Sequence, residues 1–520
     1  MKAFINTKYI WLAAMAITFS ACNDIEDVEK EFGVYTEDTV LPELSSGTVD
    51  FSNYVAIGAS FTAGYTDGAL FKAAQENSFP NILSQQFAKL DGNTFAQPLT
   101  NDNYGGLAYG GNRLPGFDPR LVFGGAGPVP LESIVGPVTV GTDIANNPTG
   151  PFKNMGIPGA KSYHLLFNGY GNPANLATQT ANPYFIRMAS STSATVLGDV
   201  MAQSPSFFTL SEIGGNDVLG FALSGGDGSN AITPVDGSVG VGFNATITYL
   251  VSTLTSGGAK GVITNVPYVR DLPHFTTVPY NPVPLDAATA AYLNSASAYG
   301  AYNAGIVQAF AYLVANTPLT QEMADAEIAK RTITFSAGEG NAVVILDENL
   351  TDLTALNPAL VNMRQATAED LLVLSAASFI GTEAVPGNAQ TINGVAVPLA
   401  DKWVLTPEEQ EAIKTATDAY NTTIATIVDS NDNLALVDLN AMLTELAATG
   451  LTSNNYNLNA NLVTGGAISL DGVHLTARGY AYLANVFLKT IDTAFGSNFE
   501  ASGNLVDIGS YPTNYSPTLQ

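Results

Sequence analysis

The chain has little cysteine, histidine, tryptophan or positive charge, and each shortage narrows what it can be. One cysteine in 520 residues cannot form an internal disulfide, and three histidines leave few candidates for a general base. The two tryptophans disfavour a carbohydrate-binding surface built from stacked indoles. Acidic residues outnumber basic ones by 46 to 19, and the net charge of −27 repels a phosphate backbone, so we expect no nucleic-acid partner. Hydrophobic residues make up 46% of the chain, which is ample material for a core.

The first 22 residues have the pattern of an export signal. Lys2 and Lys8 give a positive start, and the apolar stretch 9–18 is too short to span a membrane comfortably. Small residues then lead to Cys22, an ending that resembles the lipobox of bacterial lipoproteins. The resemblance implies that the signal peptide 1–21 is cleaved and Cys22 lipidated. We then expect anchoring in the outer membrane of a Gram-negative bacterium, with surface exposure as one option; an ordinary cleaved signal is the alternative.

Composition divides the rest of the chain into a tether, a folded domain and a tail. An acidic run follows Cys22, so we interpret residues 22–48 as a solvated tether and 49–496 as the folded domain. Within that domain, residues 97–152 and 330–402 interrupt the regular alternation of strand-like and helix-like segments, and we predict that both are insertions. The polar tail 497–520 is expected to attach only loosely.

Strands alternate with helices along the folded domain. Short apolar runs predict strands at 50–58, 207–211, 261–267, 342–346 and 434–438. Apolar periodicity and capping signals predict helices at 78–90, 245–254, 286–314, 407–428 and 476–488. Ser78 is a candidate cap for the first of these helices, and Thr406 with Glu409 forms a capping box at the fourth. This alternation favours an α/β fold with a parallel sheet covered on both faces.

Two segments carry a candidate nucleophile and base. Ser60 follows the first strand on a tight turn into a helix, where a hydroxyl is exposed and free N–H groups face any developing oxyanion. Asp471 lies three residues before His474, so its carboxylate can accept the imidazole Nδ1–H and stabilise the imidazolium. Each segment alone is also compatible with an ordinary glycine-containing turn.

Two further segments carry candidate oxyanion donors. Asn216 follows a Gly-Gly pair after the second strand, where its amide can point into the crevice beyond the strand ends. Gly156 and Gly159 lie in a short turn where glycine lets a backbone N–H approach a ligand closely, and either could supply that donor.

Taken together and in this order, these segments resemble the four blocks of the SGNH (GDSL-type) hydrolase family. Ser60 matches the nucleophile, Gly159 the backbone oxyanion donor and Asn216 the side-chain donor. Asp471 and His474 match the acid and base of the Asp-x-x-His block. The residues on either side of Ser60 differ from the usual Gly-Asp-Ser-Leu.

The resemblance implies a flavodoxin-like three-layer α/β/α sandwich with a parallel sheet. It also implies hydrolysis of carboxylic esters (lipid, short acyl or acetyl) through an acyl-enzyme on Ser60, with the N–H of Ser60 in the oxyanion hole. No metal and no organic cofactor is expected. Two alternatives remain open: a surface lipoprotein that binds glycan or lipid without catalysis, and an SGNH acyltransferase. Of the other histidines, we expect His164 to pack behind the Gly159 turn and His274 to line a loop, with a place at the pocket rim as a second option.

Overall fold

The computed structural model describes residues 40–520 except 93, 389 and 454. The predicted signal peptide, Cys22 and most of the tether therefore lie outside the described residues. The chain divides into two units, one of Met1–Glu43 with Ala501–Gly503 and the other of Leu44–Glu500 with Asn504–Gln520. All the described helices and strands belong to the second unit.

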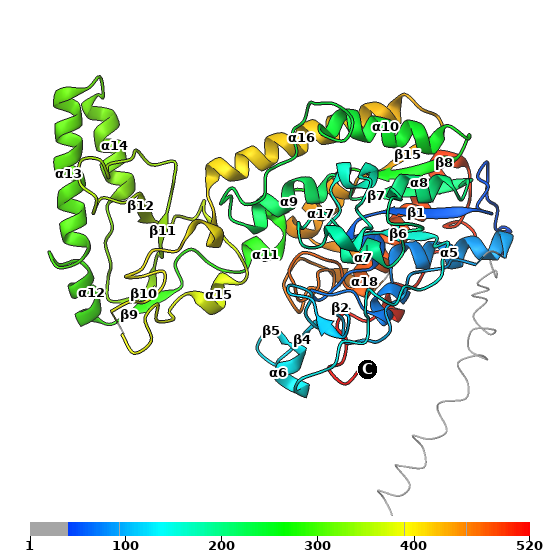
Figure 1. The fold of residues 1–520 in the computed structure, drawn as a ribbon, viewed down its shortest axis with the longest axis horizontal. Coiled ribbons are helices and arrows are strands. Elements are labelled where there is room, and N and C mark those ends of the chain that lie inside the picture. Colours follow the sequence, from blue (N-terminus) through cyan, green and yellow to red (C-terminus); the bar gives the residue numbers. More distant parts are fainter. Residues whose placement is uncertain (1–39, 93, 389, 454) are drawn as a thin grey trace, which may run out of the picture. The chain divides into compact units, whose positions relative to one another are not determined.

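A five-stranded parallel sheet forms the centre of the second unit, with the strand order β15-β8-β7-β1-β6 (Figure 1). Its strands are β1 (Tyr54–Gly58), β6 (Asn154–Gly156), β7 (Phe207–Ser211), β8 (Lys260–Thr264) and β15 (Leu434–Val437). Numbered along the chain, this order is 2-1-3-4-5, the flavodoxin-type order. All residues of β1 and β7 are buried, as expected for strands covered on both faces.

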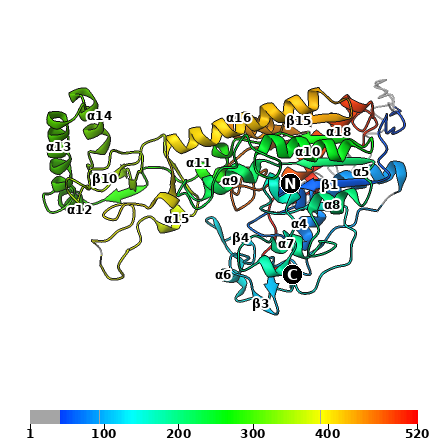
Figure 2. The same ribbon diagram turned by 45° about the horizontal axis from the view of Figure 1, so that its top comes forward.

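Two pairs of long helices cover the sheet. Helix α5 (Phe79–Asp91) packs against α18 (Ala477–Phe495), and α10 (Phe243–Thr255) packs against α16 (Pro407–Asp429). Because crossovers between parallel strands are right-handed in nearly all proteins, this strand order predicts that the second pair covers the face opposite the first. Helices α10 and α16 lie side by side in both Figures 1 and 2. The predicted α/β fold with a parallel sheet flanked by helices is thus confirmed, and the arrangement is compatible with three layers.

The remaining elements are short or lie between the strands of the sheet. The helices are α3 (Ser60–Ala63), α4 (Lys72–Glu76), α6 (Leu131–Val135), α7 (Pro183–Ile186), α8 (Val196–Met201), α9 (Gly215–Leu223), α11 (Pro273–Thr276), α12 (Ala287–Leu293), α13 (Tyr299–Asn316), α14 (Gln321–Arg331), α15 (Ala376–Phe379) and α17 (Leu439–Ala448). The strands are β2 (Ala108–Tyr109), β3 (Asn112–Arg113), β4 (Leu121–Phe123), β5 (Pro128–Pro130), β9 (Val283–Leu285), β10 (Gly338–Asn341), β11 (Val344–Leu346), β12 (Met363–Gln365), β13 (Leu371–Leu372), β14 (Val404–Leu405), β16 (Leu451–Ser453) and β17 (Tyr456–Leu458). These short strands pair as two-stranded antiparallel sheets, three of which lie between β8 and α16.

Most of the predicted elements are present, with two local corrections. The strand 207–211 matches β7, and the capping box is present because Glu409 accepts the N–H of Thr406 at 2.7 Å. Ser78 does not cap α5; its hydroxyl donates instead to Gln97 Oε1 at 3.3 Å. The single helix predicted at 286–314 is wrong, because the chain turns after Asn294 and forms α12 and α13 separately.

The expectation of a loosely attached tail is also wrong for its last part. Tyr515 is 9% exposed and its ring packs edge-on against Phe71, with the centroids 4.9 Å apart. The buried Arg120 donates to the carbonyl of Ser516 at 2.6 Å. Burial of an aromatic side chain and satisfaction of a buried guanidinium hold this segment in place. Within the described residues, none of the helices has the length and apolar character that crossing a bilayer requires.

Candidate active site

The predicted site residues follow the carboxyl ends of neighbouring strands. Gly58 at the end of β1 pairs in register with Ser211 of β7 on one side and with Gly156 of β6 on the other. Because the three strands are parallel, the segments that follow them leave the sheet at one edge. Ser60, Gly159 and Asn216 all lie on these segments, which is the edge at which open α/β sheets bind ligands.

Ser60 is the first residue of α3, two residues beyond β1, and is 7% exposed. The turn that carries it is held from behind by Glu212, which directly follows β7. Oε1 of Glu212 accepts the N–H of Ala59 at 2.6 Å and the N–H of Thr62 at 3.1 Å. Two N–H groups of the turn therefore point away from solvent, and the position of Ser60 is fixed between them.

Glu212 is a site residue that the sequence analysis did not identify. It is 5% exposed and has a φ of 48°, in the left-handed region where a residue other than glycine is uncommon. Burial raises the pKa of Glu212 to about 7, although hydrogen bonds from Thr62 and Ala59 oppose that shift. The sequence signal that could have identified Glu212 is its position directly after a fully buried strand, since an acidic side chain there needs partners inside the protein.

Asp471 and His474 form a hydrogen-bonded pair on the loop before α18. Nδ1 of His474 lies 2.9 Å from Oδ2 of Asp471, and the two side chains are 14% and 13% exposed, respectively. Oδ1 of Asp471 also accepts the backbone N–H groups of Val473 at 2.9 Å and His474 at 2.8 Å. Burial alone would raise the pKa of Asp471, but His474 and these N–H donors hold it well below its ordinary value. The carboxylate is therefore ionised and fixes the orientation of the imidazole.

The segment that follows Ser60 joins this loop to the turn that carries Ser60. The ring of His474 lies 4.6 Å from that of Tyr65 and 5.9 Å from that of Phe61, between centroids. Tyr65 in turn donates its N–H to the carbonyl of Ser60 at 2.9 Å. The N–H of Gly68 donates to Oδ2 of Asp471 at 2.8 Å. Ser60 and the Asp471–His474 pair are thus brought together through one short stretch of chain.

Asp67 also joins the segment after Ser60 to the loop of Asp471 and His474. Its role was not predicted from the sequence. Its carboxylate accepts the N–H of Leu470 at 3.0 Å, and its own N–H donates to Ser469 Oγ at 3.1 Å. Burial raises its pKa to about 7. The residues around Asp67 do not indicate this role, because its partners Ser469 and Leu470 lie about 400 positions away in the chain.

The predicted oxyanion donors also lie together. The amide of Asn216, near the start of α9, donates to the carbonyl of Ala160 at 3.0 Å, which holds it beside Gly159. Gly159 is exposed with a φ of 80°, and in the described part of the chain no hydrogen bond uses its N–H. Gly156 differs, because it is buried and its N–H donates to Asn154 Oδ1 at 3.0 Å. The geometry therefore favours Gly159 over Gly156 as a ligand-facing donor.

Asp217 ties the two oxyanion segments to each other. It is fully buried and accepts the N–H of Ser162 at 2.8 Å and the Ser162 hydroxyl at 2.7 Å. Ser162 lies three residues after Gly159, and Asp217 follows Asn216. The relative position of the backbone and side-chain donors is therefore set by an internal hydrogen-bonded link.

The other two histidines take structural positions. Nδ1 of His164 accepts the N–H of Lys161 at 3.0 Å, and its ring stacks on Tyr170 with the centroids 4.5 Å apart. His274 contacts the loop of Asp471 and His474, since its N–H donates to the carbonyl of Gly472 at 2.9 Å. Its Nδ1 lies 3.2 Å from the carbonyl oxygen of Asp471. His274 thus lies behind the Asp471–His474 pair and holds the backbone that joins them.

Comparisons of the chain with protein-family models, with curated proteins and with solved structures gave no match. The site has therefore to be judged by its own geometry. Among the described residues, the one grouping of side chains suited to a metal ion is Glu348 with Asp401 and Glu409, and it shares no residue with the Ser60 site.

Proposed function

We propose that the protein is a serine hydrolase of the SGNH type that cleaves carboxylic esters through an acyl-enzyme on Ser60. The observation that carries the proposal is the ionised Asp471 bonded to His474 Nδ1, on a loop packed against the turn of Ser60. With Nδ1 donating to the carboxylate, Nε2 of His474 is free to accept a proton. A serine on one such segment, with a base and an orienting acid on another, are the parts that acyl transfer requires.

In the first half of the reaction, His474 removes the proton of Ser60 as its Oγ attacks the ester carbonyl. The oxyanion that forms is stabilised by the N–H of Ser60, the N–H of Gly159 and the amide of Asn216. Each such donor is worth about 3 kcal/mol in the transition state, or a factor on the order of a hundred in rate. His474 then gives its proton to the leaving alcohol, and the acyl group stays on Ser60.

In the second half, His474 removes a proton from water, and the hydroxide attacks the acyl-enzyme carbonyl. The same donors stabilise the second oxyanion. When it collapses, His474 returns the proton to Ser60 and the free acid leaves. The overall reaction consumes one ester and one water and yields one acid and one alcohol, and it uses no cofactor.

The proposal is tested by hydrolysis of p-nitrophenyl esters of increasing acyl length by the purified protein. Ser60→Ala should abolish turnover while leaving the thermal melting temperature near that of the wild type. Ser252→Ala is a matched control, because Ser252 is an exposed serine on α10 whose hydroxyl donates only to the carbonyl of Tyr249 in the same helix. The preferred chain length would then distinguish acetyl, short-acyl and lipid esters.

A second measurement does not depend on knowing the substrate. A fluorophosphonate probe should label the wild type at Ser60, as identified by mass spectrometry of the modified peptide, and should fail to label Ser60→Ala. Labelling of the Asp471→Ala variant should be strongly slowed, because the base would no longer be oriented. Turnover retained in Ser60→Ala, or a wild type that neither hydrolyses any ester nor reacts with the probe, would overturn the proposal.

A further inference from the structure

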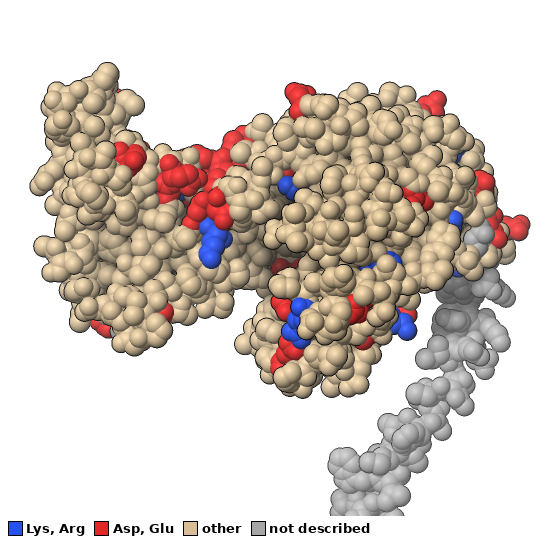
Figure 3. Space-filling view, viewed as in Figure 1, with Lys and Arg blue, Asp and Glu red and all other residues tan. Residues whose placement is uncertain are grey.

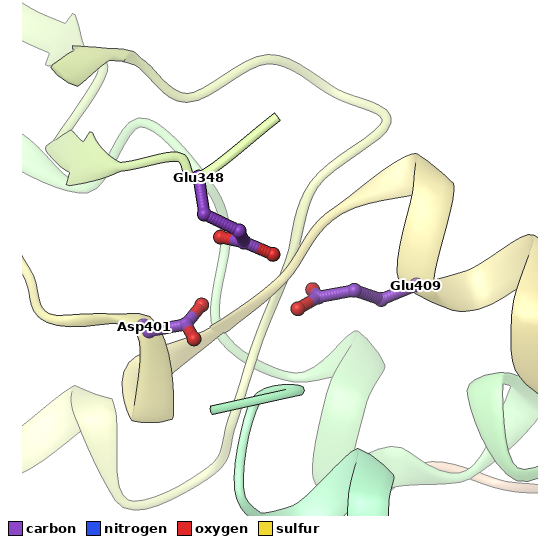
Figure 4. Close-up of side chains that lie close together, drawn as sticks. All are labelled: Glu348, Asp401 and Glu409. Carbon is purple, nitrogen blue, oxygen red and sulfur yellow. The ribbon is translucent and has the colours of Figure 1, made fainter. Parts of the chain in front are cut away.

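Three carboxylates meet where the segment between β8 and α16 returns to the sheet. Glu348 follows β11, Asp401 begins the short 3-10 helix η4 (Asp401–Trp403), and Glu409 lies in the first turn of α16. Oxygen atoms of the three side chains lie within 4.8 Å of one another, and Figure 4 shows the side chains pointing toward a common centre. Like charges at this separation repel strongly, so the arrangement calls for a compensating partner.

Buried oxygen atoms without partners face this centre. Oε1 of Glu409 and Oδ1 of Asp401 are both buried and have no hydrogen-bond partner. Glu409 is only 6% exposed, and its other oxygen, Oε2, accepts the N–H and the hydroxyl of Thr406 at 2.7 and 2.9 Å. The capping box therefore fixes the carboxylate and leaves Oε1 aimed at Glu348 and Asp401 (Figure 4). A buried carboxylate oxygen left without a donor is costly, and a bound cation would remove that cost.

The backbone closes the cluster on one side. Gly226 lies just beyond α9 with a φ of 75°, and a Cβ atom at this position would overlap Oε1 of Glu409. At the neighbouring Gly225 a Cβ atom would overlap the carbonyl oxygen of Asp401. Glycine at position 226 thus keeps the space beside the Glu409 carboxylate free of a side chain, and Gly225 allows close approach to the main chain of Asp401.

Two of the basic residues nearby pair with other acids, and Lys402, next to Asp401, places its Nζ over the ring of Trp403, 5.2 Å from the centroid. Nζ of Lys330 lies 3.8 Å from Asp347 and 3.6 Å from Glu408, and Arg364 pairs with Asp347 and Asp370. Of the ion pairs in the described chain, none involves Glu348, Asp401 or Glu409. Figure 3 shows acidic side chains gathered over the start of α16, with a basic side chain at the lower end of the group.

We propose that Glu348, Asp401 and Glu409 bind a calcium ion. The donors are all carboxylate oxygens, which are hard ligands that suit calcium or magnesium rather than zinc or copper. Calcium–oxygen distances of about 2.3–2.6 Å allow ligand oxygens up to about 4.6–5.2 Å apart, so three oxygens within 4.8 Å of one another can share one calcium ion. Magnesium loses its water ligands reluctantly and usually binds proteins through one or two carboxylates, so a set of three carboxylates favours calcium. The exposed side of Glu348 leaves room for water to complete the larger coordination shell.

Calcium at this place would join three separate segments of the chain. Glu348 belongs to the turn between β11 and β12, whereas Glu409 belongs to a helix that covers the central sheet. The ion would thus fix the segment between β8 and α16 to the helix at its end, in addition to the peptide connection. This site is independent of Ser60, and its test does not rely on esterase activity.

The test is calorimetric titration of calcium chloride into the purified protein after treatment with a chelator. We expect one calcium site, at least tenfold weaker binding of magnesium, and at least tenfold weaker binding of calcium by Glu348→Gln. Glu348 is exposed, so this substitution leaves the fold intact. Glu408→Gln is the matched control, because Glu408 lies next to Glu409 and pairs with Lys330 instead; it should bind calcium within twofold of the wild type.

Thermal melting gives a second readout. Calcium at a hundredfold excess over its Kd should raise Tm of the wild type by about 2–5 °C, and it should leave Tm of Glu348→Gln unchanged. Asp401→Asn should lose the calcium-dependent shift in the same way. Absence of a calcium site in the wild type, magnesium binding of equal strength, or wild-type calcium binding by Glu348→Gln would each overturn the proposal.

Discussion

Replacing Asp471 by asparagine changes one atom of the proposed site and has a sharply defined consequence. Oδ1 accepts two backbone N–H groups, those of Val473 and His474, while Oδ2 accepts His474 Nδ1 and the N–H of Gly68. Asparagine has one carbonyl oxygen, and the two N–H groups at the Oδ1 position hold that oxygen there. Its NH₂ group then faces His474 Nδ1.

A donor opposite Nδ1 forces the imidazole proton onto Nε2, where the proton of Ser60 would have to go. We therefore expect kcat to fall about 10⁴-fold, equivalent to about 5 kcal/mol of transition-state stabilisation. The free energy of unfolding should fall by only about 1–3 kcal/mol, because Gly68 is the one backbone N–H that loses its acceptor.

The assay is steady-state hydrolysis of the preferred p-nitrophenyl ester, with urea unfolding of the same samples. Asp286→Asn is the matched control, since Asp286 accepts an N–H at the start of α12 and has no part in the proposed chemistry. A kcat within tenfold of the wild type in Asp471→Asn would refute the claim that Asp471 sets the tautomer of His474. A loss of activity that merely followed unfolding would refute it as well.

Two further predictions concern the residues around the nucleophile. Asn216→Ala should lower kcat about 10²–10³-fold with little change in KM, and an unchanged kcat would remove Asn216 from the oxyanion hole. Burial raises the pKa of Glu212 from 4.5 to about 7, so its contribution to stability is complete below about pH 4.5 and is lost as the pH rises through 7. Between pH 5 and 8.5 the wild type should therefore lose about 2–3 kcal/mol more unfolding free energy than Glu212→Gln in urea titrations, and equal losses would contradict this sign.

The parts of the fold that were predictable depend on local signals. Strand β7 holds three large apolar residues among five, and the start of α16 is marked by a capping box, so both are predicted to within a residue or two. Strand β6 was not predicted, because three residues carry too little periodicity and its pairing with β1 is a long-range contact. The break between α12 and α13 was missed because alanine-rich sequence on both sides of Asn294 favours helix throughout.

The same distinction applies to the candidate site. Ser60, Asp471 and His474 could be proposed because each stands in a short motif with its own chemistry. Glu212, Asp67 and Asp217 could not, because their roles depend on partners from other segments of the chain. Asp217 shows this well: as the third residue of α9 it looks like a helix-capping acid, yet it is fully buried and bonds Ser162, 55 residues away.

The link between Gly68 and Asp471 spans 403 positions, and the links of Asp67 to Ser469 and Leu470 are of similar span. Contacts of such high sequence separation form late in folding, because the chain must first lose the conformational entropy of a long loop. A growing polypeptide would thus carry Ser60 about 400 residues before it carries the proposed base. Under the proposed mechanism, any product of premature termination before residue 474 lacks that base and cannot turn over an ester.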